Sequence, residues 1–363
     1  MLQNYIKIYP NSIIYLIIPN IVTGGPEALH QFGLELRKRF NVKIYYWPFF
    51  NNNFLYQKYK IKFTTKIDDD KKNIIICCEH FTQLDFVLKL KKIQKICWWL
   101  SVDNFLTSYI LQTKHKYIRS LIKIPLNFIK IINCITLGII EKPTIDEYLL
   151  FLSSFINLRK KKCISQFKFH LTQSYYSSIF LKKNKIFNKM QVSDYLNNDY
   201  FVKTDNNKKK NIICYNPSKR MSYANKIIKF CNNLKFIPLK NLSKENIITT
   251  LKTSKIYIDF GNHPGKDRIP REAAILNNCV LTNKRGSAKY YEDLSIPSEF
   301  KFKENFYNLF LIKKKINYII KNFKKEILKF DNYKIKIRNE KNIFKKEIKE
   351  LLKKNSNCKK MVV

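Results

Sequence analysis

The strongest constraint on the fold is a repeated alternation of short apolar runs with segments of helical periodicity. Because a buried parallel strand is apolar on both faces and each crossover between strands needs a helix, this alternation predicts parallel sheets flanked by helices. The expected strands form two series: 12–19, 42–46, 73–78, 96–102 and 167–172 in the first, and 211–215, 236–239, 255–260 and 279–282 in the second. Helices are expected at 26–40, about 106–158, 223–231, 244–252 and from Pro270 onward. The sequence therefore predicts an α/β protein with two αβα domains.

A polar and charged segment separates the two series. Residues 199–210 (DYFVKTDNNKKK) lack an apolar period, which is typical of a linker. We therefore predict one domain at 1–198 and a second at 211–305, followed by lysine-rich helices over 306–363. Two interpretations of these last helices stay open: a solvated amphipathic pair, or a surface that docks on a membrane.

The formal net charge of +42 would ordinarily suggest a nucleic-acid partner. Only nine of the 69 basic residues are arginines, and the abundant residues (Lys, Ile, Asn, Phe and Tyr) all have codons rich in A and T. We attribute most of the charge to this codon bias and expect no specific nucleic-acid partner. Residues 301–363, with 20 basic and 6 acidic residues, have enough local charge to favour an anionic membrane surface.

Cysteine usage indicates a reducing compartment. The nine cysteines lie mostly in apolar runs without CxxC spacing, so they are expected to be buried thiols, and no quartet of zinc ligands is visible. The N-terminal segment lacks a basic region and a cleavage site of small residues. The most lipophilic later stretch, 124–140, is too short to span a bilayer and is expected to be a core or interfacial helix. We expect a cytoplasmic protein, able to sit peripherally on the inner face of the membrane.

The first candidate site follows the first predicted strand. Gly24 and Gly25 precede a helix that carries Glu27 and His30 in its first turns. Ligands of parallel sheets bind at the carboxyl ends of strands, and a glycine turn lets them approach the backbone. The loop lacks GxGxxG, so dinucleotide binding is not indicated. Glu27 and His30 could contact substrate hydroxyls, with Glu27 a candidate catalytic residue; alternatively, Glu27 complements the helix dipole and His30 packs in the core.

The second candidate site follows the next predicted strands. Glu79 and His80 come after one strand, and Asp103 comes after WWLSV at the end of another. Asp103 or His80 could act as the general base on a hydroxyl nucleophile, and Glu79 likewise. The alternative for Asp103 and its neighbour Asn104 is to cap the helix that follows.

The third candidate site combines scarce glycines with cations. Composition disfavours Gly and Arg in this chain, yet Gly261, Gly265 and Gly286 cluster here with Arg268, Arg271 and Arg285. Lys266, Arg268 and Arg271 surround the start of a helix that contains Pro270, and helix amides with arginine forks bind phosphate. The loop Lys284-Arg285-Gly286-Ser287 could cover the same anion. Glu272 is expected to hold a ribose diol.

These residues carry a resemblance. The segments TGGPEALHQFGLEL, WWLSVDN, HLTQSYY, YIDFGNHPGKDRIPREAA and VLTNKRGSAKYYED resemble glycosyltransferase-like proteins of bacterial surface-polysaccharide clusters, within the GT-B class. The resemblance implies two Rossmann-like domains that face each other across a cleft. It also implies that Lys219 and Arg220 contact a diphosphate. Retaining members carry two glutamates eight positions apart; the second matches Glu272, but Pro264 stands at the first.

The resemblance implies a metal-independent glycosyltransferase with no cofactor. The donor would be a UDP- or GDP-type sugar nucleotide, with its diphosphate bound by Lys219, Arg220, Gly265, Lys266, Arg268, Arg285, Gly286 and Ser287. The acceptor would be a glycan or a lipid-linked acceptor on the first domain. Two alternatives remain: a sugar-nucleotide epimerase on the same fold, and a non-catalytic protein that binds nucleic acid or membrane.

Overall fold

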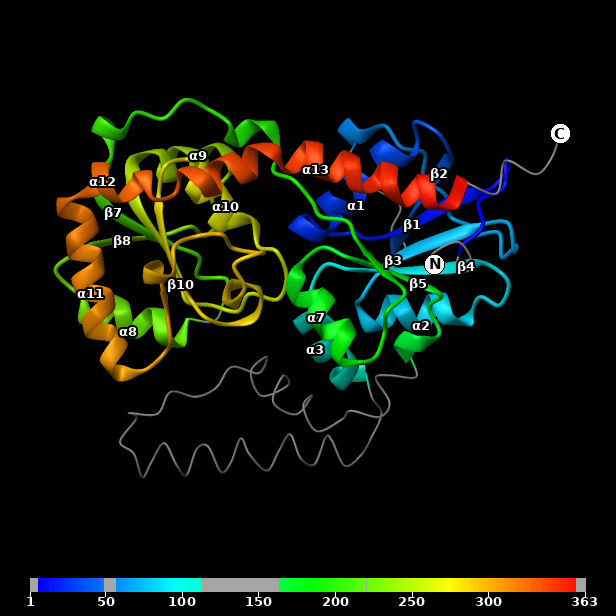
Figure 1. Ribbon diagram of the computed structural model, residues 1–363, viewed down its shortest axis with the longest axis horizontal. Coiled ribbons are helices and arrows are strands. Elements are labelled where there is room, and N and C mark those ends of the chain that lie inside the picture. The colour runs from blue at the N-terminus through cyan, green and yellow to red at the C-terminus, as the bar shows by residue number, and fades with distance from the viewer. Residues whose placement is uncertain (1–5, 49–56, 113–162, 220, 357–363) are drawn as a thin grey trace, which may run out of the picture. The chain divides into compact units, whose positions relative to one another are not determined.

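The computed structural model describes residues 6–48, 57–112, 163–219 and 221–356, which form two compact units (Figure 1). Unit 1 contains the described residues up to Asp194 and those from Lys341 onward, and unit 2 runs from Tyr195 to Glu340. Arg220, the segment 124–140 and most of the helix expected at 106–158 lie outside the described residues.

Unit 1 is built on a sheet of six parallel strands. In spatial order these are β2 (Asn41–Trp47), β1 (Ile13–Pro19), β3 (Ile74–Cys78), β4 (Gln94–Trp99), β5 (Phe169–Thr172) and β6 (Lys189–Gln191). Its helices include α1 (Gly24–Leu36), α2 (Phe81–Lys89), α3 (Val102–Gln112) and α7 (Tyr175–Lys183). The predicted parallel α/β architecture is confirmed.

The burial of the strands in unit 1 explains the apolar runs in the sequence. The central five residues of β1 are buried because helices cover both faces of the sheet. The expected strand at 96–102 ends earlier, at Trp99, because Val102 already begins α3. The strand β6 and the helices α2 and α7 were not predicted: β6 is only three residues long, and each helix has only nine.

Unit 2 contains a second parallel sheet with five strands. Their spatial order is β11 (Lys301–Phe302), β10 (Cys279–Asn283), β9 (Ser254–Asp259), β7 (Lys210–Tyr215) and β8 (Lys235–Pro238). The helices are α8 (Ser222–Phe230), α9 (Lys244–Thr253), α10 (Arg268–Ile275), α11 (Phe306–Lys321), α12 (Phe323–Leu328) and α13 (Asp331–Ser356). The predicted C-terminal helices are therefore present.

The last helix, α13, contributes to both units. Its residues up to Glu340 belong to unit 2, where Tyr333 and Ile337 are buried in the core. Its residues from Lys341 belong to unit 1, where Phe344 packs against Phe32 of α1 with ring centroids 6.4 Å apart. Among the described helices, none is both long and apolar enough to cross a bilayer.

Each sheet has one point at which the strand order reverses. In unit 2 the chain goes from β7 to β8 on one side and then to β9 on the other, so the reversal lies between β7 and β9. In unit 1 the corresponding point lies between β1 and β3. At such a point the connections from the two neighbouring strands run to opposite sides of the sheet. Their loops therefore separate at the carboxyl ends of the strands, and open α/β sheets bind ligands there.

Candidate functional site

The loops at the reversal point of unit 2 are tied to one another. The Ser287 amide, in the loop after β10, donates to the His263 carbonyl in the loop after β9 at 2.9 Å. The Ser287 hydroxyl donates to the Gly265 carbonyl, and the Asn283 amide group donates to the Gly261 carbonyl at 2.7 Å. The two loops that the sequence predicts to face one anion therefore form a single hydrogen-bonded structure.

Two of the scarce glycines are required by this packing. Gly286 has φ +48°, and a Cβ at this position would lie 2.0 Å from the His263 carbonyl oxygen. A Cβ on Gly261 would lie 2.5 Å from Cβ of Lys219, in the loop after β7. Any larger residue would push the three loops apart, which explains why glycine occurs here against the composition of the chain.

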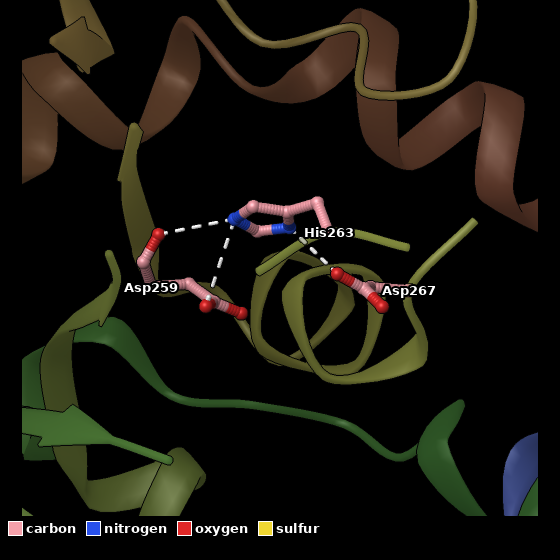
Figure 2. Close-up of side chains that lie close together, drawn as sticks. All are labelled: Asp259, His263 and Asp267. Atoms are coloured by element: carbon pink, nitrogen blue, oxygen red, sulfur yellow. Dashed lines mark hydrogen bonds and ion pairs between the residues drawn. The ribbon is translucent and has the colours of Figure 1, made fainter. Parts of the chain in front are cut away.

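A cluster of charged side chains lies at the same reversal point. Lys219 Nζ is 2.7 Å from Asp259 Oδ2 at the end of β9 and 2.8 Å from Asp267 Oδ2. Figure 2 shows the buried imidazole of His263 between the two aspartates, with Nδ1 2.6 Å from Asp267 Oδ2 and Nε2 3.2 Å from the Asp259 carbonyl oxygen. Tyr257 donates to Asp259 at 3.1 Å. We call Lys219, Asp259, His263 and Asp267 the lysine–aspartate cluster.

In this cluster the combined attraction between opposite charges shifts the pKa values further than burial does. Burial alone would raise the pKa of Asp267, but the ammonium of Lys219 and the hydrogen bond from His263 lower it to about 2. Burial would lower the pKa of Lys219, and the two aspartates raise it instead. Both charges are therefore held at neutral pH.

Asp259, His263 and Asp267 each offer one nitrogen or oxygen atom that could ligate a metal ion. These atoms lie within 4.8 Å of one another, a spacing that a metal ion could use. The ammonium of Lys219 already bonds to both carboxylates. Within the described residues the cluster is thus balanced by a lysine, and its geometry alone does not call for a metal.

Arg271 has a structural role in unit 2. Its side chain is fully buried and donates to the carbonyls of Asp267 and Lys266 at 3.0 and 3.1 Å, and to Glu340 of α13 at 2.9 Å. Lys266 Nζ lies 2.9 Å from the other oxygen of Glu340. Arg271, one of the cations expected to surround an anion, therefore holds the loop after β9 to α13.

Arg268 and Glu272 lie in the first two turns of α10. Glu272 is 7% exposed, and burial raises its pKa although Arg268, Arg271 and a hydrogen bond from Tyr200 act against the rise. Arg268 opens the helix and is half-buried. Helix amides, a guanidinium and a carboxylate thus meet at one edge of the reversal point, which is a combination suited to a phosphate next to a diol.

Arg285 is partnered within unit 2. Its Nη2 lies 2.7 Å from Glu304 Oε2, and Glu304 also accepts from Asn283 at 2.8 Å. The Arg285 side chain is 45% exposed, so it pairs with Glu304 and is still partly open to solvent.

In unit 1 the side chains near the start of α1 bond to one another. His30 is fully buried; its Nδ1 donates to the Pro26 carbonyl at 2.7 Å and its Nε2 accepts from Tyr46 at 3.1 Å. Burial lowers the pKa of His30 to about 4, so the ring is neutral. Glu27 accepts from the Tyr59 hydroxyl and pairs with Lys58 at 3.3 Å.

Polar residues also follow β3 and β4, as expected. Glu79 is 2% exposed and accepts from the Leu100 amide at 2.8 Å; burial raises its pKa to about 7 against that hydrogen bond. His80 precedes α2 and hydrogen-bonds to Thr82 at 2.9 Å. Asp103, in the first turn of α3, accepts from Tyr176 at 2.9 Å. The cap of α3 comes from Ser101, whose hydroxyl accepts from the Asn104 amide.

The expected site residues thus fall into one group in each unit. The group in unit 2 lies on the loops after β7, β9 and β10 and in the first turns of α10: Lys219, Gly265, Lys266, Arg268, Glu272, Arg285, Gly286 and Ser287. The group in unit 1 follows β1, β3 and β4: Gly24, Gly25, Glu27, His30, His80 and Asp103. Sequence reasoning missed the roles of Asp259, His263 and Asp267, although their spacing of four residues was a visible signal.

No protein-family model and no curated protein sequence matches this chain. Solved structures match its fold. Sucrose-phosphate synthase from Thermosynechococcus elongatus has a TM-score of 0.62 at 9% identity, covering 94% of this chain and 98% of the other. HepE from Anabaena, in complex with UDP and glucose, has a TM-score of 0.60 at 10% identity over 94% and 99%. A glycosyltransferase from Rickettsia africae has a TM-score of 0.50 at 15% identity over 98% and 100%.

These likenesses extend over almost the full length of each chain, and at such low identities they establish the fold alone. They confirm the GT-B fold that the sequence predicts, with two parallel-sheet α/β domains and their helices.

Proposed function

We propose that this chain is a glycosyltransferase that transfers a sugar from a nucleoside-diphosphate sugar to a glycan or lipid-linked glycan. The observation that carries the proposal is the reversal point of unit 2, where Arg268 and the buried Glu272 open α10 beside two interlocked glycine loops. The fold supports it, because HepE has the same fold and its structure contains UDP and glucose.

In this proposal unit 2 holds the donor by fixed charge. Transfer separates an oxocarbenium-like sugar from a leaving diphosphate, and cations already in place stabilise that charge without reorganisation. Arg268 and Arg285 would meet the diphosphate directly. The Gly265 and Gly286 backbone and Ser287 would shape the loop around it, and Lys266 would support that loop through Glu340. Glu272 would accept hydrogen bonds from the ribose hydroxyls.

Lys219 would contribute by exchanging partners. Its ammonium lies between Asp259 and Asp267, so a diphosphate that enters must compete with two carboxylates for it. The matching proposal for unit 1 is that the acceptor binds near Gly24 and Gly25, with Asp103 or His80 as the base and Glu27 nearby. We propose that the reaction takes place in the cytoplasm at the inner face of a membrane, where lipid-linked acceptors reside.

The test is release of nucleoside diphosphate from a panel of UDP- and GDP-sugars, measured with and without glycan acceptors. We expect one donor to be consumed only when acceptor is present, and Arg268→Ala to lower the rate at least tenfold. Arg39→Ala removes an exposed arginine of unit 1 and serves as the control.

Three results would contradict the proposal. The first is an Arg268→Ala protein that is folded and transfers sugar as fast as the parent from every donor. The second is conversion of the nucleotide sugar without acceptor, which indicates an epimerase. The third is salt-sensitive binding to nucleic acid with no binding of any nucleotide sugar, which indicates a non-catalytic protein.

A further inference from the structure

The side of unit 2 formed by α8 and α11 has a row of exposed apolar side chains. Phe306 is 75% exposed, Tyr307 68% and Phe310 50%, all in the first turns of α11, and Leu311 and Tyr318 continue the row. α11 lies beside α8 (Figure 1). We call the exposed surface of these two helices the α8–α11 face. Single exposed apolar residues are ordinary, whereas five on one helix call for an explanation.

The rings on this face are held in place. Phe306 and Phe310 pack edge to face with centroids 5.6 Å apart, and Phe310 packs in the same way on Phe230 of α8 at 4.8 Å. The opposite side of α11 anchors the helix, because Leu309, Ile312, Ile316 and Ile319 are buried in the core of unit 2. The exposed rings are therefore presented by an ordered helix.

The two helices that form this face carry charge of one sign. Helices α8 and α11 together contain six lysines and no acidic residue: Lys226, Lys229, Lys313, Lys314, Lys315 and Lys321. Lys315 pairs with Glu299 and Glu326. Lys229, Lys314 and Lys321 are exposed, as is Lys303 just before α11. Exposed apolar side chains with exposed lysines beside them match the boundary between acyl chains and anionic headgroups.

We propose that the α8–α11 face docks on an anionic lipid bilayer. The rings of Phe306, Tyr307 and Phe310 enter the interface, and the exposed lysines meet the lipid phosphates. Two observations favour a bilayer over single-stranded nucleic acid. Leu311 has no ring on which a base could stack, and the edge-to-face pair of Phe306 and Phe310 does not form a flat stacking platform.

This inference rests on the proposed function in one respect: a lipid-linked acceptor gives docking a use. The docking proposal and the proposed function can fail independently of each other. Vesicle binding needs no nucleotide, and nucleotide binding by unit 2 needs no vesicle. A chain that binds anionic vesicles through this face but binds no UDP or GDP would overturn the proposed function and leave the docking face standing.

The experiment is flotation of the full chain with vesicles of phosphatidylcholine, alone or with about 30% phosphatidylglycerol. We expect binding to the anionic vesicles only. The double variant Phe306→Ser/Phe310→Ser should bind them at least tenfold more weakly while it stays folded, with thermal unfolding only slightly lowered because at least half of each ring is exposed. Lys314→Glu/Lys321→Glu should weaken binding to a similar degree. Phe63→Ser, which removes a 69% exposed ring of unit 1 next to Lys62, should bind like the parent.

Equal binding of the parent and of Phe306→Ser/Phe310→Ser to anionic vesicles would overturn the proposal, since another part of the chain would then carry the binding. Absence of vesicle binding by the parent would overturn it too. So would a double variant that keeps its vesicle binding but loses affinity for polyuridine, because the rings would then contact nucleic acid.

Discussion

At the scale of single residues, the lysine–aspartate cluster explains how a buried loop tolerates so many charges. Asp259 is 1% exposed at its side chain, and Lys219 is 16% exposed. An unpaired charge at such a depth costs several kcal/mol, whereas a pair with additional hydrogen bonds does not. Lys219 therefore both holds the loop after β9 and keeps a cation at the point where we propose that the diphosphate binds.

We predict that Lys219→Met lowers the free energy of unfolding at pH 7 by about 3 kcal/mol, because it leaves the buried Asp259 and the partly buried Asp267 without their cation. The folded pKa of Asp267 is about 2, below its ordinary 3.8. The stability linked to this depressed pKa is present above pH 4 and is lost as the pH falls toward 2. The gap between variant and parent should therefore narrow in acid.

Urea unfolding at pH 7, 5 and 3 measures this gap, and Lys229→Met, an exposed lysine of the same unit, is the control. Equal stability of Lys219→Met and the parent at pH 7 would show that the cluster is not a net stabilising pair. If the difference in stability between Lys219→Met and the parent grew as the pH falls, the lowered pKa of Asp267 would be contradicted.

The same cluster shows where sequence reasoning stops. The position of Lys219 after a predicted strand was readable, and so was the spacing of Asp259, His263 and Asp267. Their meeting depends on β7 lying next to β9, which skips β8 in the chain. Local patterns predict that strands exist, but this order is set by the packing of the whole sheet, so the partner of each charge could not be predicted.

At the scale of elements, the strand–helix alternation was sufficient to predict most strands and helices of both units. The predictions failed for β6 and β11, where two or three residues carry no period, and for the nine-residue helices α2 and α7. For α13 they offered a solvated amphipathic helix or a membrane-docking surface, and no contact with the candidate site. In the structure Glu340 of α13 binds Arg271 and Lys266, so this helix fixes the start of α10.

We predict that Arg271→Met destabilises the chain by at least about 3 kcal/mol, because it removes three donors and leaves Glu340 buried with one cation fewer. Arg338→Met changes an exposed arginine two residues before Glu340 on the same helix, and it should leave stability unchanged within about 0.5 kcal/mol. Chemical denaturation of both variants measures these changes in the free energy of unfolding. Similar stabilities of the two would mean that the contact between Arg271 and α13 does not hold the loop.

At the scale of the whole molecule, the fold and the charge lead to different partners. A net charge of +42 suggests a polyanion, whereas only a few of these cations lie on the loops at the reversal point of unit 2. The proposed nucleotide site uses Arg268 and Arg285, and the proposed membrane face uses a separate set of lysines. Total charge alone therefore did not lead to the proposed site, whereas the positions of the scarce glycines and arginines did.

The central claim is that unit 2 binds a nucleoside diphosphate at its reversal point. The most direct measurement is calorimetric titration of the full chain with UDP and GDP, and then with the 2′-deoxy form of the tighter ligand. We predict that one of them binds and that Arg268→Ala weakens it at least tenfold. Glu272→Ala should weaken the ribonucleotide more than the 2′-deoxynucleotide, because only the former offers the diol. If neither nucleotide binds the folded parent, or if both variants bind like the parent, the claim is wrong.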